Sequence, residues 1–118
     1  MSVSEPLVQS VLLGDAVEHA PVAILVADDE MRYVAANQYA CELLGYTREE
    51  LLEKRITDIA RNPEAPAEFR EMMASGGLNG VSTVVRGDGT ELKLRYRAKE
   101  TTMAGLLYYV SVSWPEDG

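Results

Sequence analysis

The clearest pattern of hydrophobic and polar positions lies in residues 80–99, where the two kinds of side chain alternate on both sides of Asp88-Gly89. An Asp-Gly pair is typical of a two-residue hairpin turn, because both residues tolerate positive φ. Pairing outward from that turn places Val85 opposite Leu92. One face then carries Val81, Thr83, Val85, Leu92, Leu94 and Tyr96, and the other carries Ser82, Arg86, Glu91, Lys93, Arg95 and Arg97. The agreement of the two alternations predicts an antiparallel hairpin with one apolar face.

Three more strands are expected around this hairpin. The apolar run 21–27 is uninterrupted, which is typical of a central strand buried on both faces. A second short strand is predicted over 32–36, after an acidic turn, and a last strand over 106–114, after a turn at Ala104-Gly105. Most of the last strand is apolar in both phases, so we expect the outer face of the sheet to be covered near this strand, by the first helix of the same chain or of a second copy.

The helical signals precede the hairpin. A first helix is predicted over 4–19, with Ser4 as cap and Pro6 in the first turn. Asn37 suits the N-cap of a second helix that Gly45 closes, and residues 47–50 form a capping box. Shorter helical signals follow at 56–60 and at 66–75, the latter with Phe69, Met72 and Met73 on one face. Helices first and an antiparallel sheet afterwards predict an α+β sensor or binding domain, not a parallel α/β enzyme.

Composition and charge narrow the class of protein. The chain has 118 residues, 47% of them hydrophobic and 25% charged, as expected for one globular domain. Its formal net charge of -8 argues against direct nucleic-acid binding and against acidic membranes. The basic stripe Lys93, Arg95, Arg97 and Lys99 is read either as a solvated strand face or as a docking surface for an acidic partner or an acidic helix.

Cysteine usage and hydropathy favour a cytoplasmic location. Cys41 is the one cysteine, so no internal disulfide can form, which fits a reducing compartment. No apolar run reaches the length of a membrane span, and the N-terminus lacks a signal-peptide pattern. Neither end reads as a self-sufficient stop, which leaves open that the chain is part of a larger protein.

Three groups of residues carry a family resemblance. The first is Ile24-Leu25-Val26-Ala27-Asp28 followed by Val34-Ala35-Ala36-Asn37, a strand, an acidic turn and a short strand that ends in Asn. The second is Asn37 followed by Ala40, Leu43-Leu44-Gly45-Tyr46-Thr47 and Glu49-Glu50-Leu51, and the third is the Asp88-Gly89-Thr90 hairpin. In this order and spacing they cover residues 12–114, and the chain resembles a PAS domain.

The resemblance implies a five-stranded antiparallel sheet with short helices on one face, preceded by an N-terminal amphipathic helix. Residues 1–20 would form that helix, for dimerisation or to cover the sheet, 21–114 the PAS-like core domain, and 115–118 a tail. The core could hold a small apolar or aromatic ligand, or a non-covalent flavin. Its predicted lining is Ile24, Val26, Val34, Tyr39, Leu43, Leu44, Ile56, Ile59, Phe69, Met72, Met73, Leu78, Val81, Thr83, Leu94 and Tyr96. The alternative is a filled core without a ligand.

Some positions depart from the family pattern. Glu30 and Glu53 stand where the family often has Gly, so the turn at Glu30 is expected to differ in shape. The family's last strand usually runs into an Asp-Ile-Thr signature that joins the domain to its effector. Here Ser113-Trp114-Pro115-Glu116 replaces that signature, which puts the usual output linkage in doubt.

The chemistry-bearing residues favour binding over catalysis. His19 is the one histidine, and it is expected at the surface or a dimer seam, with no metal site. The helix at 66–75 lacks the His of haem-binding relatives, and Met72 and Met73 read as core. Cys41 lacks the Asn-Cys-Arg-Phe-Leu motif of light-sensing relatives and reads as a small buried residue. The acidic turn 28–30 reads as solvated. No nucleophile–base set or phosphate loop is present, so no enzyme is predicted.

Two function classes follow. One is a sensory or regulatory module that binds a small ligand or a cofactor, with flavin- or haem-based redox or gas sensing as a variant. The other is a ligand-free dimerisation or docking module of a larger signalling or transcription-regulating protein. In both, the expected partners are a second copy of the chain, through Leu7, Val8, Val11 and Leu12, and an effector domain or signalling protein.

Overall fold

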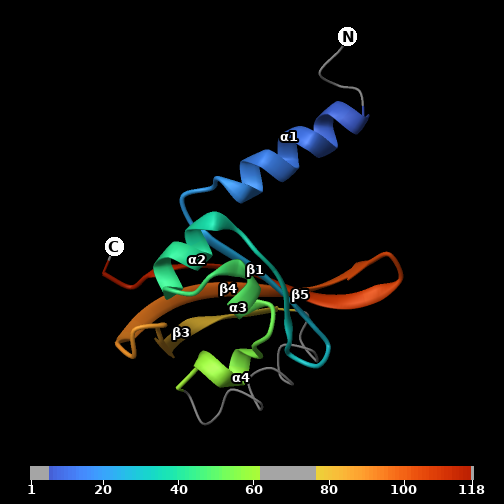
Figure 1. The fold of residues 1–118 in the computed structure, drawn as a ribbon. Coiled ribbons are helices and arrows are strands. Elements are labelled where there is room, and N and C mark those ends of the chain that lie inside the picture. The colour runs from blue at the N-terminus through green and yellow to red at the C-terminus, as the bar shows by residue number, and fades with distance from the viewer. Residues whose placement is uncertain (1–5, 62–76, 118) are drawn as a thin grey trace.

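A five-stranded antiparallel sheet with short helices on one face makes up the computed structural model (Figure 1), as the sequence predicts. The structure describes residues 6–61 and 77–117. The elements are α1 (Pro6–Glu18), β1 (Ala23–Asp28), β2 (Tyr33–Ala36), α2 (Gln38–Leu44), α3 (Arg48–Leu51), α4 (Ile56–Ile59), β3 (Gly77–Val85), β4 (Glu91–Met103) and β5 (Leu106–Pro115). The strand order is β2-β1-β5-β4-β3, so the first and last strands lie side by side at the centre. The helix predicted at 66–75 lies outside the described residues.

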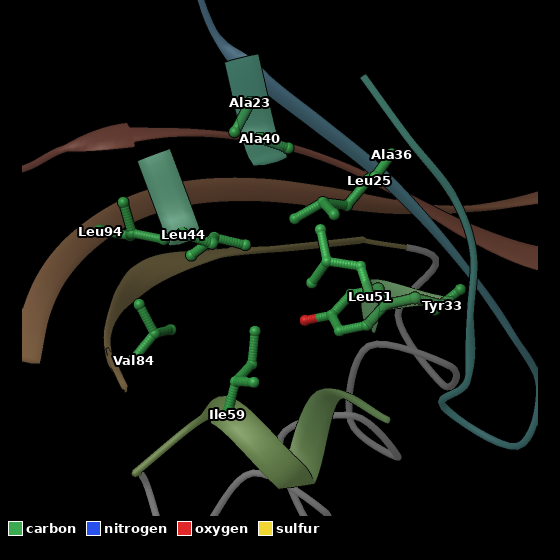
Figure 2. Packing of buried hydrophobic residues seen from close by; sticks show 11 residues of the cluster. Ala23, Leu25, Tyr33, Ala36, Ala40, Leu44, Leu51, Ile59, Val84 and Leu94 are labelled. Atoms are coloured by element: carbon green, nitrogen blue, oxygen red, sulfur yellow. The ribbon is translucent and has the colours of Figure 1, made fainter. Parts of the chain in front are cut away.

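The core lies between the sheet and the helices α2, α3 and α4 (Figure 2). Leu44 from α2 and Leu51 from α3 are both 0% exposed, and Ile59 from α4 is 2% exposed. The sheet contributes Ala23, Leu25, Ala27, Tyr33, Ala36, Val84 and Leu94 to the same cluster. Each of these short helices therefore holds its place through one or two apolar anchors, because helices of this length are not stable on their own.

Local sequence signals fix the ends of the core helices. The side-chain oxygen of Asn37 accepts a hydrogen bond from the backbone N–H of Ala40, which confirms the predicted N-cap of α2. Gly45 ends α2 in the left-handed conformation, with φ of 75°. Thr47 and Glu50 form the predicted capping box of α3, with bonds of 3.1 and 2.8 Å. These ends were readable because capping depends only on residues close in sequence.

The hairpin between β3 and β4 is present, but its predicted register is wrong by one residue. Val85 pairs with Glu91, and Val84 pairs with Leu92. The N–H of Arg86 bonds the carbonyl of Thr90, so the loop between that pair is Gly87-Asp88-Gly89. Gly89 has φ of 88°, the left-handed position that a three-residue hairpin loop requires.

This shift exchanges the two faces of β3. Leu92, Leu94 and Tyr96 on β4 face inward as predicted. On β3, however, Val84 is buried in the core, whereas Val81 is 41% exposed and Thr83 pairs with Lys93 on the outer side. Because side chains alternate with a period of two, a slip of one residue moves a whole strand's set to the other face.

Burial along β1 also differs from the prediction of a strand covered on both sides. Ala23, Leu25 and Ala27 are buried, whereas Ile24 and Val26 are only partly buried. The helices of the described residues pack on the side of Leu25, so the opposite side of β1 keeps apolar surface in contact with solvent. In Figure 1, α1 extends away from the sheet and does not cover this side.

Candidate functional site

The inner face of the sheet is the surface on which the family resemblance places a ligand. Across its centre, hydrogen-bonded pairing aligns Ala23, Ser113, Tyr96 and Gly80 in one row. The next row contains Leu25, Ser111 and Ala98. At the middle of the sheet, the inner face of β5 therefore carries two small polar side chains, Ser111 and Ser113.

Ser113 is the most unusual side chain of this row. It is 3% exposed, and its Oγ has no hydrogen-bond partner in the part of the chain that the structure describes. The hydroxyl of Ser111, by contrast, bonds the carbonyl of Leu25 at 3.4 Å. A buried hydroxyl without a partner costs about 1–3 kcal/mol, so Ser113 needs a specific explanation. Nothing in the pattern of β5 singled it out, because its alternate residues Val110, Val112 and Trp114 dominate the hydropathy.

Several predicted lining residues do reach the core. Leu44, Ile59 and Leu94 are buried in it, and Tyr96 lies on the inner face of β4. Tyr39, Leu43 and Ile56 are partly buried against the same cluster. The sequence missed Tyr33, a buried member of the core. Burial and, to a smaller extent, the charge of Asp58 raise the pKa of its hydroxyl, which therefore stays protonated.

Other predicted lining residues lie elsewhere. Ile24 and Val26 are on the outer face of β1, opposite Val112 and Val110. Val34 is 43% exposed because the pairing of β1 with β2 shifts between Val26 and Ala27, which takes Val34 out of the regular alternation. Val81 and Thr83 lie on the outer face for the register reason given above. Phe69, Met72, Met73 and the side chain of Leu78 are outside what the structure describes.

The outer face of the sheet joins an apolar strip to a basic one. The strip of Ile24, Val26, Val110 and Val112 lies on β1 and β5, and its members are partly exposed. Directly alongside on β4, Arg95 pairs with Trp114, Arg97 with Val112 and Lys99 with Val110. Arg95 approaches Glu116 at 3.9 Å. The predicted basic stripe is thus in register with uncovered apolar side chains.

Helix α1 is the second exposed apolar surface. None of its residues is buried, and Leu7, Val11 and Leu13 are 76%, 63% and 64% exposed. At 100° per residue, Leu7 and Val11 lie on one side, whereas Leu13 and Val17 lie on the other. The apolar side chains therefore surround the helix more than the predicted single stripe does. Within one copy of the chain, α1 does not cover the outer face of the sheet (Figure 1). Cover by a second copy stays a prediction.

The remaining groups that the sequence singled out are Cys41, His19 and the acidic turn 28–30. Cys41 is partly buried against the core, and burial raises the pKa of its thiol, with Arg48 opposing the shift. His19 is exposed just after α1. In the acidic turn, the carboxylate of Asp28 accepts from the N–H groups of Glu30 and Arg32, so it shapes the turn. Among the described residues, no cluster of three or more His, Cys, Asp or Glu side chains could hold a metal ion.

Comparison with known proteins agrees with this fold. The profile of the PAS domain family matches residues 21–107. A PAS domain from a two-component sensor histidine kinase superimposes with a TM-score of 0.84 at 12% identity, covering 95% of this chain and 100% of that one. A domain of a sensory box sensor histidine kinase/response regulator from Geobacter sulfurreducens gives 0.80 at 22% identity, covering 95% and 98%.

A structure described as an RNA-binding light-oxygen-voltage receptor also superimposes, with a TM-score of 0.83 at 20% identity. The superposition covers 98% of this chain and 35% of that one. No protein with a curated description matches significantly. Among the helices of residues 6–61 and 77–117, none is long and apolar enough to cross a membrane.

The five-stranded sheet and the helices packed on one of its faces define an α+β domain. The family match covers most of that fold, and the chain belongs to the PAS domain family.

Proposed function

We propose that this PAS domain is a non-catalytic regulatory module that forms a homodimer through α1, with Leu7, Val8, Val11 and Leu12 in the interface. The supporting observation is the exposure of α1, which leaves no residue buried in a single copy. The uncovered strip on β1 and β5 supports the same proposal, because two exposed apolar surfaces on one small domain favour association. Apolar anchors at the centre of an interface contribute most of its affinity.

Sedimentation velocity tests the dimer. We expect a dimer for the wild type and a folded monomer for Val11→Glu combined with Leu12→Glu. Gln9→Glu combined with Ser10→Glu is the matched control, because it adds the same charges to polar positions of the same helix and should remain dimeric. A wild type that is monomeric at high micromolar concentration would overturn the dimer.

The output is proposed to pass to an effector domain or a partner protein of a signalling system. Two structural neighbours are described as parts of sensor histidine kinases, which supports linkage to such effectors. No direct contact with nucleic acid or membrane is proposed, because the net charge is -8.

A second candidate function is ligand sensing at the inner face, and the buried hydroxyl of Ser113 favours it. A small organic ligand that carries one hydrogen-bonding group beside an apolar body would satisfy that hydroxyl and contact Ala23 and Leu25. The basic side chains of β4 lie on the other face, so an uncharged ligand fits better than a phosphate or carboxylate.

Native mass spectrometry and a visible absorption spectrum of the purified chain test this candidate. We expect no haem Soret band and no light-induced adduct that disappears in Cys41→Ser. Ser113→Ala should weaken retention of a ligand but should not destabilise the ligand-free chain, because it removes an unpaired buried hydroxyl. Loss of more than about 1 kcal/mol in ligand-free Ser113→Ala would show that the hydroxyl already has a partner.

A further inference from the structure

Asn37 binds more than the helix that it caps. Its Oδ1 accepts from the N–H groups of Ala40 and Ile24, both at 3.0 Å. Its Nδ2 donates to the carbonyl oxygens of Val17 at 2.8 Å and Val22 at 3.0 Å. Asn37 itself is 4% exposed. One buried amide thus holds the N-terminus of α2 with its oxygen and the C-terminus of α1 with its nitrogen.

The carbonyl of Val17 accepts two hydrogen bonds at the end of α1, a local one from the N–H of Ala20 at 3.3 Å and the shorter one from Asn37. The last four carbonyls of a helix have no partner within the helix, and Val17 is one of them. A second contact acts at the same end of α1. Arg48 on α3 places Nη2 2.6 Å from Oε1 of Glu18, and its Nε donates to the carbonyl of Ala36 at 3.0 Å. The guanidinium also brings positive charge to the negative end of the α1 dipole.

These polar contacts replace the packing that usually fixes a helix. Because α1 buries no side chain, its direction relative to the sheet depends on how its last turn is held. The residues that hold it belong to the core. Asn37 follows β2 directly and begins α2, and Ala36, which receives the Arg48 bond, is buried in the core cluster.

We propose that Asn37 and Arg48 are positioning residues that set the direction of α1 and couple it to the packing of the core. A shift of α2 or of the end of β2 would move Asn37 and the carbonyl of Ala36 that Arg48 binds, and would thereby reorient α1. The inference deepens the proposed function, since it rests on α1 being the dimerisation helix. The contacts that hold α1 lie within a single copy of the chain, so its direction can be tested separately from dimerisation.

Asn37→Asp separates the two roles of this side chain. The aspartate keeps oxygens that accept from Ala40 and Ile24, but it loses the donor to Val17 and Val22 and places negative charge against those carbonyls. We expect α2 to stay folded while the amides of His19 and Ala20 exchange several-fold faster with solvent. Lowering the pH should raise the protection factors of these amides again, beyond the slowing that every amide shows in acid, because the protonated carboxyl regains one donor. A purely structural cap would show no such recovery.

Electron spin resonance can report the direction of α1. Spin labels at Ser10→Cys and Thr57→Cys, in a Cys41→Ser background and diluted with unlabelled protein, measure the distance from α1 to α4 within one copy. We expect Asn37→Asp to broaden that distance distribution strongly and Glu18→Gln to broaden it moderately. Glu91→Gln is the matched control, because it weakens the exposed Arg61–Glu91 pair, 3.2 Å long and remote from α1, and should leave the distribution unchanged.

Wild-type distributions in both Asn37→Asp and Glu18→Gln would overturn the proposal. If Asn37→Asp fails to fold, Glu18→Gln and Arg48→Met decide the question through the same distance. A monomeric wild type with an ordered α1 that these variants release would refute the dimer and support the positioning role. If the wild type is a dimer and none of the variants changes the distance distribution between α1 and α4, the positioning role alone is refuted.

Discussion

The two longest helices among the described residues, α1 and α2, differ in length, in capping and in burial. Helix α2 has 7 residues, is closed at both ends by Asn37 and Gly45, and buries Ala40 and Leu44. Helix α1 has 13 residues and buries none. The difference shows that apolar composition and length do not decide burial. The connection does: α2 follows β2 directly onto the sheet, whereas α1 is joined to the core only at its last turn.

The largest contrast is expected between Leu44→Ala and Leu13→Ala. Leu44 is 0% exposed, so its truncation should lower the free energy of unfolding by about 2–5 kcal/mol. Leu13 is 64% exposed, and its truncation should change the stability of the monomer by less than about 0.5 kcal/mol. Urea denaturation of each variant measures both values. A large loss in Leu13→Ala would mean that α1 packs on its own core.

The next largest effects on stability are expected at two glycines, Gly87 in the hairpin loop and Gly14 in α1. A Cβ on Gly87 would overlap the carbonyl oxygen of Gly45, at the end of α2, and the N–H of Gly87 donates to the carbonyl of Leu44 at 2.8 Å. Gly87→Ala should therefore destabilise the fold by about 1–3 kcal/mol, the scale of a local overpacking. A urea midpoint equal to that of the wild type would show that the hairpin loop does not press on α2.

In α1 the corresponding change should stabilise. Gly14 has no heavy atom within 4 Å of the position that a Cβ would take. Gly14→Ala should therefore favour α1 by about 0.5–1 kcal/mol, because alanine loses less backbone entropy in a helix. Circular dichroism and amide exchange measure the helicity. Unchanged exchange in α1 would indicate that this segment is not helical in the free chain.

The smallest expected effect is a difference in pH response. Hydrogen bonds from Thr47 hold the pKa of Glu50 below the ordinary value of 4.5. A carboxyl whose pKa is lower in the folded state adds stability at pH above 4.5, and this is lost as the pH falls through its folded value. Acidification should therefore fray α3 before α1, which has no acidic residue in its first turn. An NMR titration measures this: the chemical shifts of residues in α3 should change with pH in the wild type, and this change should be absent in Glu50→Gln.

The sequence was sufficient wherever a contact is local. The caps of α2 and α3 depend on residues within a few positions, and the order of strands and helices follows from the apolar periods. The hairpin shows where this stops. Asp88-Gly89 allows a two-residue loop, but Gly87 permits a third residue, and the choice depends on packing against Gly45. That contact joins residues far apart in the chain, so no local pattern could reveal it.

The candidate site was harder to predict than the fold for the same reason. The lining expected on β3 followed the predicted hairpin register, which was wrong by one residue, and that on β1 belonged to an uninterrupted apolar run, which does not show which face turns inward. Asn37 was predicted as a cap, and its second role at Val17 depends on a bond that spans 20 residues. Ser113 is buried in a strand whose neighbours are apolar, and its lack of a partner is a property of the assembled sheet alone.

The three-residue loop Gly87-Asp88-Gly89 also limits how this domain can change in length. Gly87 lies against Gly45 and donates its N–H to the carbonyl of Leu44, so a residue inserted before Gly87 would displace the hairpin from the end of α2. A residue inserted beside Gly89 would only lengthen the turn, because nothing lies within 4 Å of a Cβ there and β5 holds β4 in place. A library of single insertions should therefore yield folded protein when the residue is added at Gly89 and unstable protein when it is added before Gly87.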